Sequence, residues 1–174
     1  MDERAIKGLQ ASVEGFANEH ITVGILMKKY QNVSLVDLPL SPYDIVIVFK
    51  KNNKEEIIRA QVKTARRSVG FTGGTRGGVD RFYKSGVKKY TQSTKTSDVI
   101  IGLSPKSNGE KNVFDLYFIP TILVEILKQN SISLKKIEKL KNNYEILEKC
   151  KDVKFILKQC KEYGIIKIKR LQGS

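Results

Sequence analysis

The chain has 174 residues, of which 40% are hydrophobic, and this fits one globular domain with a core of its own. Its 32 Lys and Arg against 18 Asp and Glu give a formal net charge of +14, which indicates an anionic partner such as nucleic acid. No apolar run reaches the roughly 18 residues of a membrane span, and the first residues lack the apolar stretch of a signal peptide.

The first predicted element is a long helix from about residue 4 to residue 30, because apolar residues recur there at helical spacing. Those residues are Ile6, Leu9, Val13, Phe16, Ala17, His20, Val23, Gly24 and Met27. A short strand over residues 33–36 and a turn with two prolines follow.

Two apolar, β-branched runs over residues 43–49 and 57–64 predict neighbouring strands joined by a hairpin-like connection at residues 50–54. Asp44 lies near the start of the first run. On the second run, Gln61 and Lys63 share one face, because successive side chains of a strand point to opposite faces. The two strands therefore place a carboxylate, an amide and an ammonium around one small volume.

The region that follows is predicted to be a loop over residues 68–78, because five glycines there disfavour regular structure: Gly70, Gly73, Gly74, Gly77 and Gly78. Apolar runs at 99–103 and 113–119 predict two more strands. A helix is expected after Pro120 and Thr121. Two amphipathic segments, 134–147 and 153–160, and a last strand over 165–168 complete the chain.

These elements predict an α/β fold with a central mixed β-sheet flanked by helices and extra helices near the C-terminus. We expect a core over residues 1–130, a helical element over 131–170 that packs on the core or extends it, and a cloning scar at 171–174. Cys150, Cys160 and the single His20 are too few for a structural zinc site. We expect both cysteines to be buried free thiols.

The segments Pro42-Tyr43-Asp44 and Gln61-Val62-Lys63 resemble the core motif of the PD-(D/E)XK nuclease superfamily, an acidic residue on one strand followed by (D/E/Q)-X-K on the next. The glutamine is similar to the branch that includes intron-encoded (homing) endonucleases and related archaeal and viral nucleases. Thr64-Ala65-Arg66 and the run from Phe114 to Pro120 fit that branch too. The resemblance implies a restriction-endonuclease-like core and a Mg²⁺-dependent DNA endonuclease, with Mn²⁺ as a substitute metal.

The resemblance also implies roles for the residues of the motif. Asp44 would bind the metal, assisted by the Gln61 amide and the backbone carbonyl of Val62 as weaker oxygen ligands. Lys63 would orient the attacking hydroxide or stabilise the charge that develops on the phosphate. In such families a glutamate on the first helix completes the metal site.

Two glutamates, Glu14 and Glu19, compete for this part. They are five residues apart, about 140° around a helix, so both cannot face one site. The family's usual spacing, with apolar residues four and seven positions after the glutamate, favours Glu19, which Val23 and Leu26 follow. Glu14 stays the alternative, since Asn18 stands where a glycine often precedes the glutamate.

Basic residues surround the glycine-rich stretch, where glycines allow the backbone to approach a duplex closely. We expect phosphate contacts from five of them: Arg66, Arg67, Arg76, Arg81 and Lys84. The chain has no Gly-x-x-x-x-Gly-Lys-[Ser/Thr] pattern, so no nucleotide cofactor is expected.

Two alternative functions stay open. The neutral Gln61 brings no charge to a metal, which leaves room for an inactive nucleic-acid-binding protein that retains the nuclease fold. An RNA-processing nuclease on the same scaffold is the other. A homodimer is possible through the C-terminal amphipathic helices, which could equally pack on their own sheet. We expect no membrane contact and a cytoplasmic location, in the host cytoplasm for a viral protein.

Overall fold

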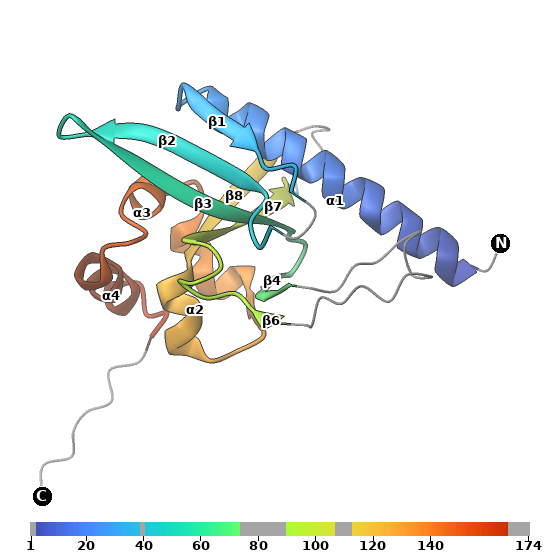
Figure 1. The fold of residues 1–174 in the computed structure, drawn as a ribbon. Helices are drawn as coiled ribbons and strands as arrows, with labels where there is room; N and C mark the ends of the chain where they lie inside the picture. The colour runs from blue at the N-terminus through green and yellow to red at the C-terminus, as the bar shows by residue number, and fades with distance from the viewer. Residues whose placement is uncertain (1–2, 39–40, 74–89, 107–112, 167–174) are drawn as a thin grey trace, which may run out of the picture.

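The structure is a computed structural model that describes residues 3–38, 41–73, 90–106 and 113–166 (Figure 1). Within these ranges, no helix combines the length and the apolar character needed to span a bilayer.

The described part of the chain begins with a long helix, continues with a series of strands, and ends with short helices around one further strand. The first half contains α1 (Glu3–Met27), β1 (Asn32–Leu35), β2 (Ile45–Lys51), β3 (Lys54–Thr64), β4 (Ser68–Gly70) and β5 (Thr72–Gly73). The second half contains β6 (Tyr90–Thr91), β7 (Val99–Pro105), β8 (Phe114–Pro120), α2 (Thr121–Leu127), β9 (Ser131–Ser133), the 3₁₀-helix η2 (Leu134–Leu140), α3 (Tyr144–Glu148) and α4 (Val153–Glu162).

Five strands form the central sheet in the order β1-β2-β3-β7-β8. β3 and β7 are parallel and the other neighbours are antiparallel, so the sheet is mixed. Asn52 and Asn53 take positive φ angles of 51° and 60° in the β2–β3 hairpin, which is the conformation that a tight two-residue turn requires. The predicted fold class, a mixed α/β fold with a central sheet flanked by helices, is confirmed.

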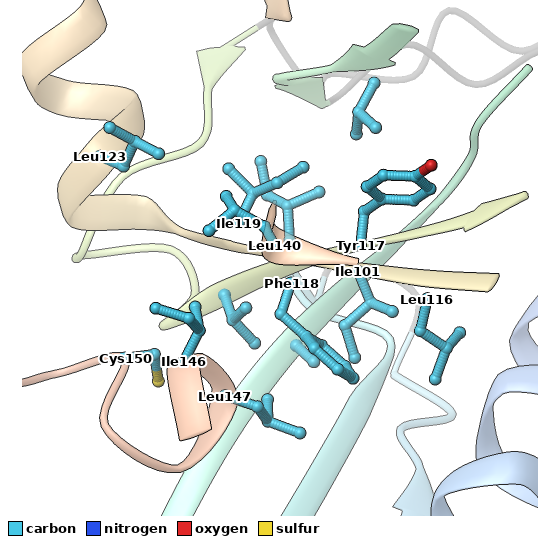
Figure 2. Close-up of a cluster of buried hydrophobic side chains, with 14 of the residues drawn as sticks. Ile101, Leu116, Tyr117, Phe118, Ile119, Leu123, Leu140, Ile146, Leu147 and Cys150 are labelled. Atoms are coloured by element: carbon cyan, nitrogen blue, oxygen red, sulfur yellow. The ribbon is translucent and has the colours of Figure 1, made fainter. Parts of the chain in front are cut away.

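Side chains of β8 alternate between the two faces of this sheet, with Phe118 on one face and Tyr117 on the other (Figure 2). The Phe118 ring lies 5.1 Å from the ring of Tyr144 in α3, which lies 6.3 Å from the ring of Tyr30 just after α1. On the opposite face, the Tyr117 hydroxyl donates to Glu138 of η2 at 3.1 Å. Helices therefore cover both faces, and β3 runs through the middle of the buried layer.

The glycine-rich stretch is more regular than we predicted. β4 pairs with β9, and β5 pairs with β6, where Gly73 is opposite Tyr90. A Cβ at Gly73 would come within 2.7 Å of the Tyr90 ring, so the glycine permits a close approach inside a strand. The predicted loop is therefore wrong for residues 68–73, while residues 74–78 lie outside the described ranges.

The first of the two amphipathic segments is divided into η2 and α3. Asn142 between them has a φ angle of 51°, and the side chain of Asn143 then caps α3 by accepting from the Ile146 N–H. The second segment is confirmed as α4, capped in the same way by Asp152. Residues 165 and 166 are not in a strand, and residues 167–168 of the predicted last strand lie outside the described ranges.

Apolar side chains of the C-terminal helices belong to the same hydrophobic core as the sheet. The buried members are Ile137, Leu140, Ile146, Leu147, Cys150, Ile156 and Cys160. Both cysteines are free and buried, as expected. These faces pack on their own sheet, which is one of the two arrangements that the sequence left open.

Candidate active site

Asp44 immediately precedes β2, at the point where the pairing of β2 with β3 ends. Its backbone N–H still donates to the Ala60 carbonyl at 2.9 Å. Its carboxylate accepts from the backbone N–H of Val62 at 2.7 Å and from the side-chain nitrogen of Gln61. Burial raises the pKa of Asp44, and these two donors and the charge on Lys63 oppose that rise.

Lys63 lies on β3, two residues after Gln61, and its charge interacts with two carboxylates. Burial lowers the pKa of Lys63, whereas the charges of Asp44 and Glu19 raise it. The Lys63 side chain is thus within electrostatic range of both acids.

Glu19 comes to this site from α1, which polar contacts hold against β3. The Asn18 side-chain amide donates to the Thr64 hydroxyl at 2.7 Å, and the Thr22 hydroxyl donates to the Asn18 carbonyl at 2.7 Å. Burial and the charge on Asp44 raise the pKa of Glu19 to about 7, against the effects of His20 and Lys63. A half-buried carboxyl with a pKa this high, beside a second carboxylate, is typical of a functional site.

Glu14 lies elsewhere on the helix. Its carboxylate accepts from the Arg66 guanidinium at 3.0 and 3.1 Å, and both side chains are exposed to solvent. The structure therefore groups Glu19 with Asp44 and Lys63 and separates Glu14 from them. That Glu19 binds a metal stays a prediction.

A buried hydrogen-bond chain determines the orientation of the Gln61 amide. Gln92 is 1% exposed, and its side-chain nitrogen donates to the Pro42 carbonyl at 3.2 Å and to Gln61 Oε1 at 2.9 Å. Gln92 Oε1 accepts from the hydroxyls of Ser97 and Thr96 at 2.9 and 2.6 Å. Because a carbonyl can only accept, Pro42 fixes which end of the Gln92 amide carries the nitrogen.

Gln61 consequently turns its oxygen toward Gln92 and its nitrogen toward Asp44. In this arrangement the Gln61 side chain is a hydrogen-bond donor to Asp44, and its oxygen does not face the site as we expected for a metal ligand. The N–H and the carbonyl of Val62 point to the same side of β3, and the N–H bonds to Asp44. The Val62 carbonyl therefore faces the region next to the N-terminal end of β2, where Asp44 lies.

Replacing Gln92 with leucine should raise the pKa of Asp44 further. Without Gln92, the Gln61 amide is free to rotate and the Asp44 carboxylate loses a donor that favours its charged form. Carboxyl ¹³C NMR over a pH titration of the metal-free protein measures this directly. Gln129→Leu, at an exposed glutamine, is the matched control. An Asp44 pKa identical in both variants would show that Gln92 does not hold Gln61.

The donors at this site suit Mg²⁺, which prefers hard oxygen ligands. They are the carboxylates of Glu19 and Asp44 and the carbonyl of Val62. A divalent cation would also relieve the unfavourable proximity of the two acids. Among the described residues no three His, Cys, Asp or Glu side chains gather into a metal-binding group, so water and substrate oxygens would have to complete the coordination.

Only part of the predicted nucleic-acid contacts can be placed. Arg66 and Arg67 follow β3 directly and are exposed, with Arg66 paired to Glu14. Arg76, Arg81 and Lys84 lie outside the described residues.

Sequence reasoning missed two residues that shape the site. The sequence offered one signal for Asn18, because Asn18 and Thr22 are polar residues one helical turn apart. The structure buries both of them toward the sheet. Gln92 had none, because it belongs to a polar stretch 31 residues away from its partner Gln61.

No family model matches the sequence, and no curated protein matches it. Among solved structures, the chain is similar to the structure of a bacterial homing endonuclease, I-Ssp6803I, with 14% sequence identity and a TM-score of 0.47. The match covers 71% of this chain and 76% of that chain.

Proposed function

We propose that the protein is a metal-dependent endonuclease of the PD-(D/E)XK type that hydrolyses phosphodiester bonds in DNA. The observation that carries the proposal is that Glu19 of α1, Asp44 just before β2 and Lys63 of β3 interact electrostatically at the N-terminal end of β2. Two acids and an ammonium in one half-buried site supply charges for a divalent cation and for the phosphate it accompanies.

Glu19, Asp44 and the Val62 carbonyl would hold Mg²⁺, or Mn²⁺ in its place. When bound, the cation acts as a Lewis acid toward a phosphate oxygen and lowers the pKa of a coordinated water. The hydrogen bonds from Val62 N–H and from Gln61 keep the Asp44 carboxylate in position for this role.

Lys63 would donate hydrogen bonds to the phosphate at which cleavage occurs. As the water oxygen bonds to phosphorus, the bond from phosphorus to the leaving sugar oxygen breaks and negative charge grows on the phosphate oxygens. A fixed ammonium stabilises this charge more strongly in a partly buried site than in water.

Substrate affinity would come from the basic surface of the protein. With a net charge of +14, the chain should bind the DNA backbone with little regard to sequence. Arg66 and Arg67 lie three and four residues after Lys63, just beyond the end of β3, and are exposed, so they are well placed for neighbouring phosphates. The proposal also includes phosphate contacts from Arg76, Arg81 and Lys84.

The proposal is tested by incubating the protein with supercoiled plasmid and with RNA, in Mg²⁺, in Mn²⁺ and in EDTA. We expect nicked and linear DNA only with a divalent metal. Asp44→Asn should abolish both cleavage and the metal binding seen by calorimetry, because it removes a ligand charge while keeping an oxygen that can accept from Val62. Asp37→Asn, at an exposed aspartate seven residues earlier, is the control.

Each other outcome has a definite meaning. Metal binding that survives in Asp44→Asn would place the metal elsewhere. DNA that is bound but uncut in either metal would support the inactive binding protein, and cleavage restricted to RNA would support the RNA-processing alternative.

A further inference from the structure

Helix α1 carries an apolar stripe in addition to the residues that face the sheet. Its members recur at alternating spacings of three and four residues: Ile6, Leu9, Val13, Phe16, His20, Val23 and Met27. This is the a/d pattern of a coiled coil, maintained over three heptads. A single helix packed on a sheet does not require it.

The stripe and the sheet-facing residues lie on different sides of the helix. Asn18, Thr22 and Leu26 are buried toward the sheet. At 100° per residue, the centre of the stripe is more than 100° away from them. Accordingly Val13 is 62% exposed and Phe16 is 65% exposed. The N-terminal half of α1 extends beyond the sheet (Figure 1).

Three further members of the stripe are also exposed large apolar side chains: Ile6, Leu9 and Met27. Five apolar members of the stripe are therefore exposed, whereas Val23 packs partly against the core and His20 is a polar member. An apolar surface of this extent marks an interaction site on a protein that is otherwise rich in charge.

We propose that this stripe pairs with the same stripe on a second copy of the chain, forming a homodimer through two α1 helices. A heptad seam is complementary to another helix with the same repeat, and the chain itself supplies one, related by a two-fold axis. On the flank away from the candidate active site, the positions Gln10, Ala17 and Gly24 are uncharged, and two of them are small, whereas the other flank carries Glu19. A Cβ at Gly24 would meet no atom within 4 Å, so a partner helix has room to approach there.

The charges favour an antiparallel pair. A parallel pair would bring Lys28 and Lys29 of both copies together, along with two bodies of net charge +14. An antiparallel pair separates these bodies and aligns the helix dipoles favourably. In the a-to-d register of such a pair, Val13 faces the partner's Phe16, so the two most exposed stripe residues lie at the centre of the seam, where interface energy concentrates.

The size of the seam sets the expected affinity. In this register the paired part of the stripe runs from Ile6, which faces the partner's Val23, to Val23, about 26 Å of helix at 1.5 Å per residue. Two helices in contact over this length bury on the order of 1,000 Å², which is the small end of specific interfaces. We therefore expect a dissociation constant in the micromolar range.

Sedimentation velocity over a concentration series tests the proposal without reference to nuclease activity. The parent protein should shift from monomer to dimer between roughly 1 and 200 µM, the range that corresponds to micromolar affinity. Val13→Glu combined with Phe16→Glu should stay monomeric throughout. The matched control is Ile57→Glu combined with Val153→Glu, at residues that are 51% and 50% exposed outside the stripe, and it should dimerise like the parent.

A cross-link gives a second readout if the glutamate variant loses its helical circular dichroism. Val13→Cys protein mixed with Phe16→Cys protein should form a disulfide-linked heterodimer on mild oxidation, because Cys150 and Cys160 are buried. A parent protein that stays monomeric throughout the series would overturn the proposal. So would equal dimerisation of the stripe variant and its control, which would place the interface elsewhere.

Discussion

Replacing Lys63 with methionine should lower the rate of DNA cleavage by about 10²–10³-fold at saturating Mg²⁺, the usual effect of removing one group that stabilises transition-state charge. Methionine keeps the length of the partly buried side chain, so the fold should be retained. Affinity for DNA should fall only a few-fold, because one phosphate contact among many is lost. Single-turnover cleavage and fluorescence anisotropy separate the two effects.

The control for this prediction is Lys54→Met, which makes the same change on the same strand at an exposed lysine. It should leave the cleavage rate near that of the parent. If Lys63→Met cleaves at the parent rate with metal at saturation, the lysine takes no part in the reaction and the proposed site is wrong.

The second large effect is expected at the helix acid. Glu19→Gln should reduce cleavage by roughly 10²-fold or more, because it removes one of the two charges that would hold the metal, while Glu14→Gln should stay within a few-fold of the parent. Glu14 and Arg66 form a surface ion pair with side chains that are 41% and 74% exposed, and such pairs contribute little. The reverse ranking would place Glu14 in the site.

The pH dependence of the free energy of unfolding tests the environment of Glu19 independently of cleavage. Burial and the charge on Asp44 raise the pKa of Glu19 from its ordinary value of 4.5 to about 7, so the folded protein holds a proton that the unfolded chain releases between these pH values. The free energy of unfolding should therefore decrease as pH rises from 4.5 to 7 and level off above 7.

The Glu19→Gln variant has no carboxyl at this position, so its free energy of unfolding does not show this decrease. Without metal and above pH 7, it should therefore be more stable than the parent, by at most about 3 kcal/mol and less after solvent screening. Urea denaturation at pH 4.5 and pH 8 tests the sign. A variant that is destabilised equally at both pH values would mean that Glu19 is not under strain in the parent.

Local pattern predicted most of the sheet, because its strands are long and strongly apolar. Period-two alternation correctly placed Gln61 and Lys63 on one face of β3, and the β-branched run after Asp44 located the strand that this residue precedes. The short pairs β4–β9 and β5–β6 were missed, since each depends on a partner far away in the chain and only tertiary structure brings the two together.

The candidate site likewise combines features that local pattern predicts with features that only tertiary contacts determine. Helical geometry predicted that Glu14 and Glu19 could not both face Asp44, and the resemblance to a family favoured Glu19. The contact of Asn18 with Thr64, 46 residues away, is a tertiary contact that no local pattern predicts. The orientation of the Gln61 amide depended on Gln92 and Pro42, which no local pattern connects to it. That Asp44, Gln61 and Lys63 come from neighbouring strands could thus be predicted from sequence, while the direction of the hydrogen bonds among them could not.

The small ladder in which Gly73 is opposite Tyr90 has a consequence for how this protein can diversify. It fixes the entry and exit of residues 74–89 at neighbouring points, and the charge of Asp44 reaches Tyr90 at one of them. For a flexible connection between two neighbouring points, each doubling of length costs only about 0.6 kcal/mol. We therefore expect insertions and deletions between Gly73 and Tyr90 to be tolerated. Under the proposed function, a lineage could acquire new target preferences in this way while Glu19, Asp44 and Lys63 keep their arrangement.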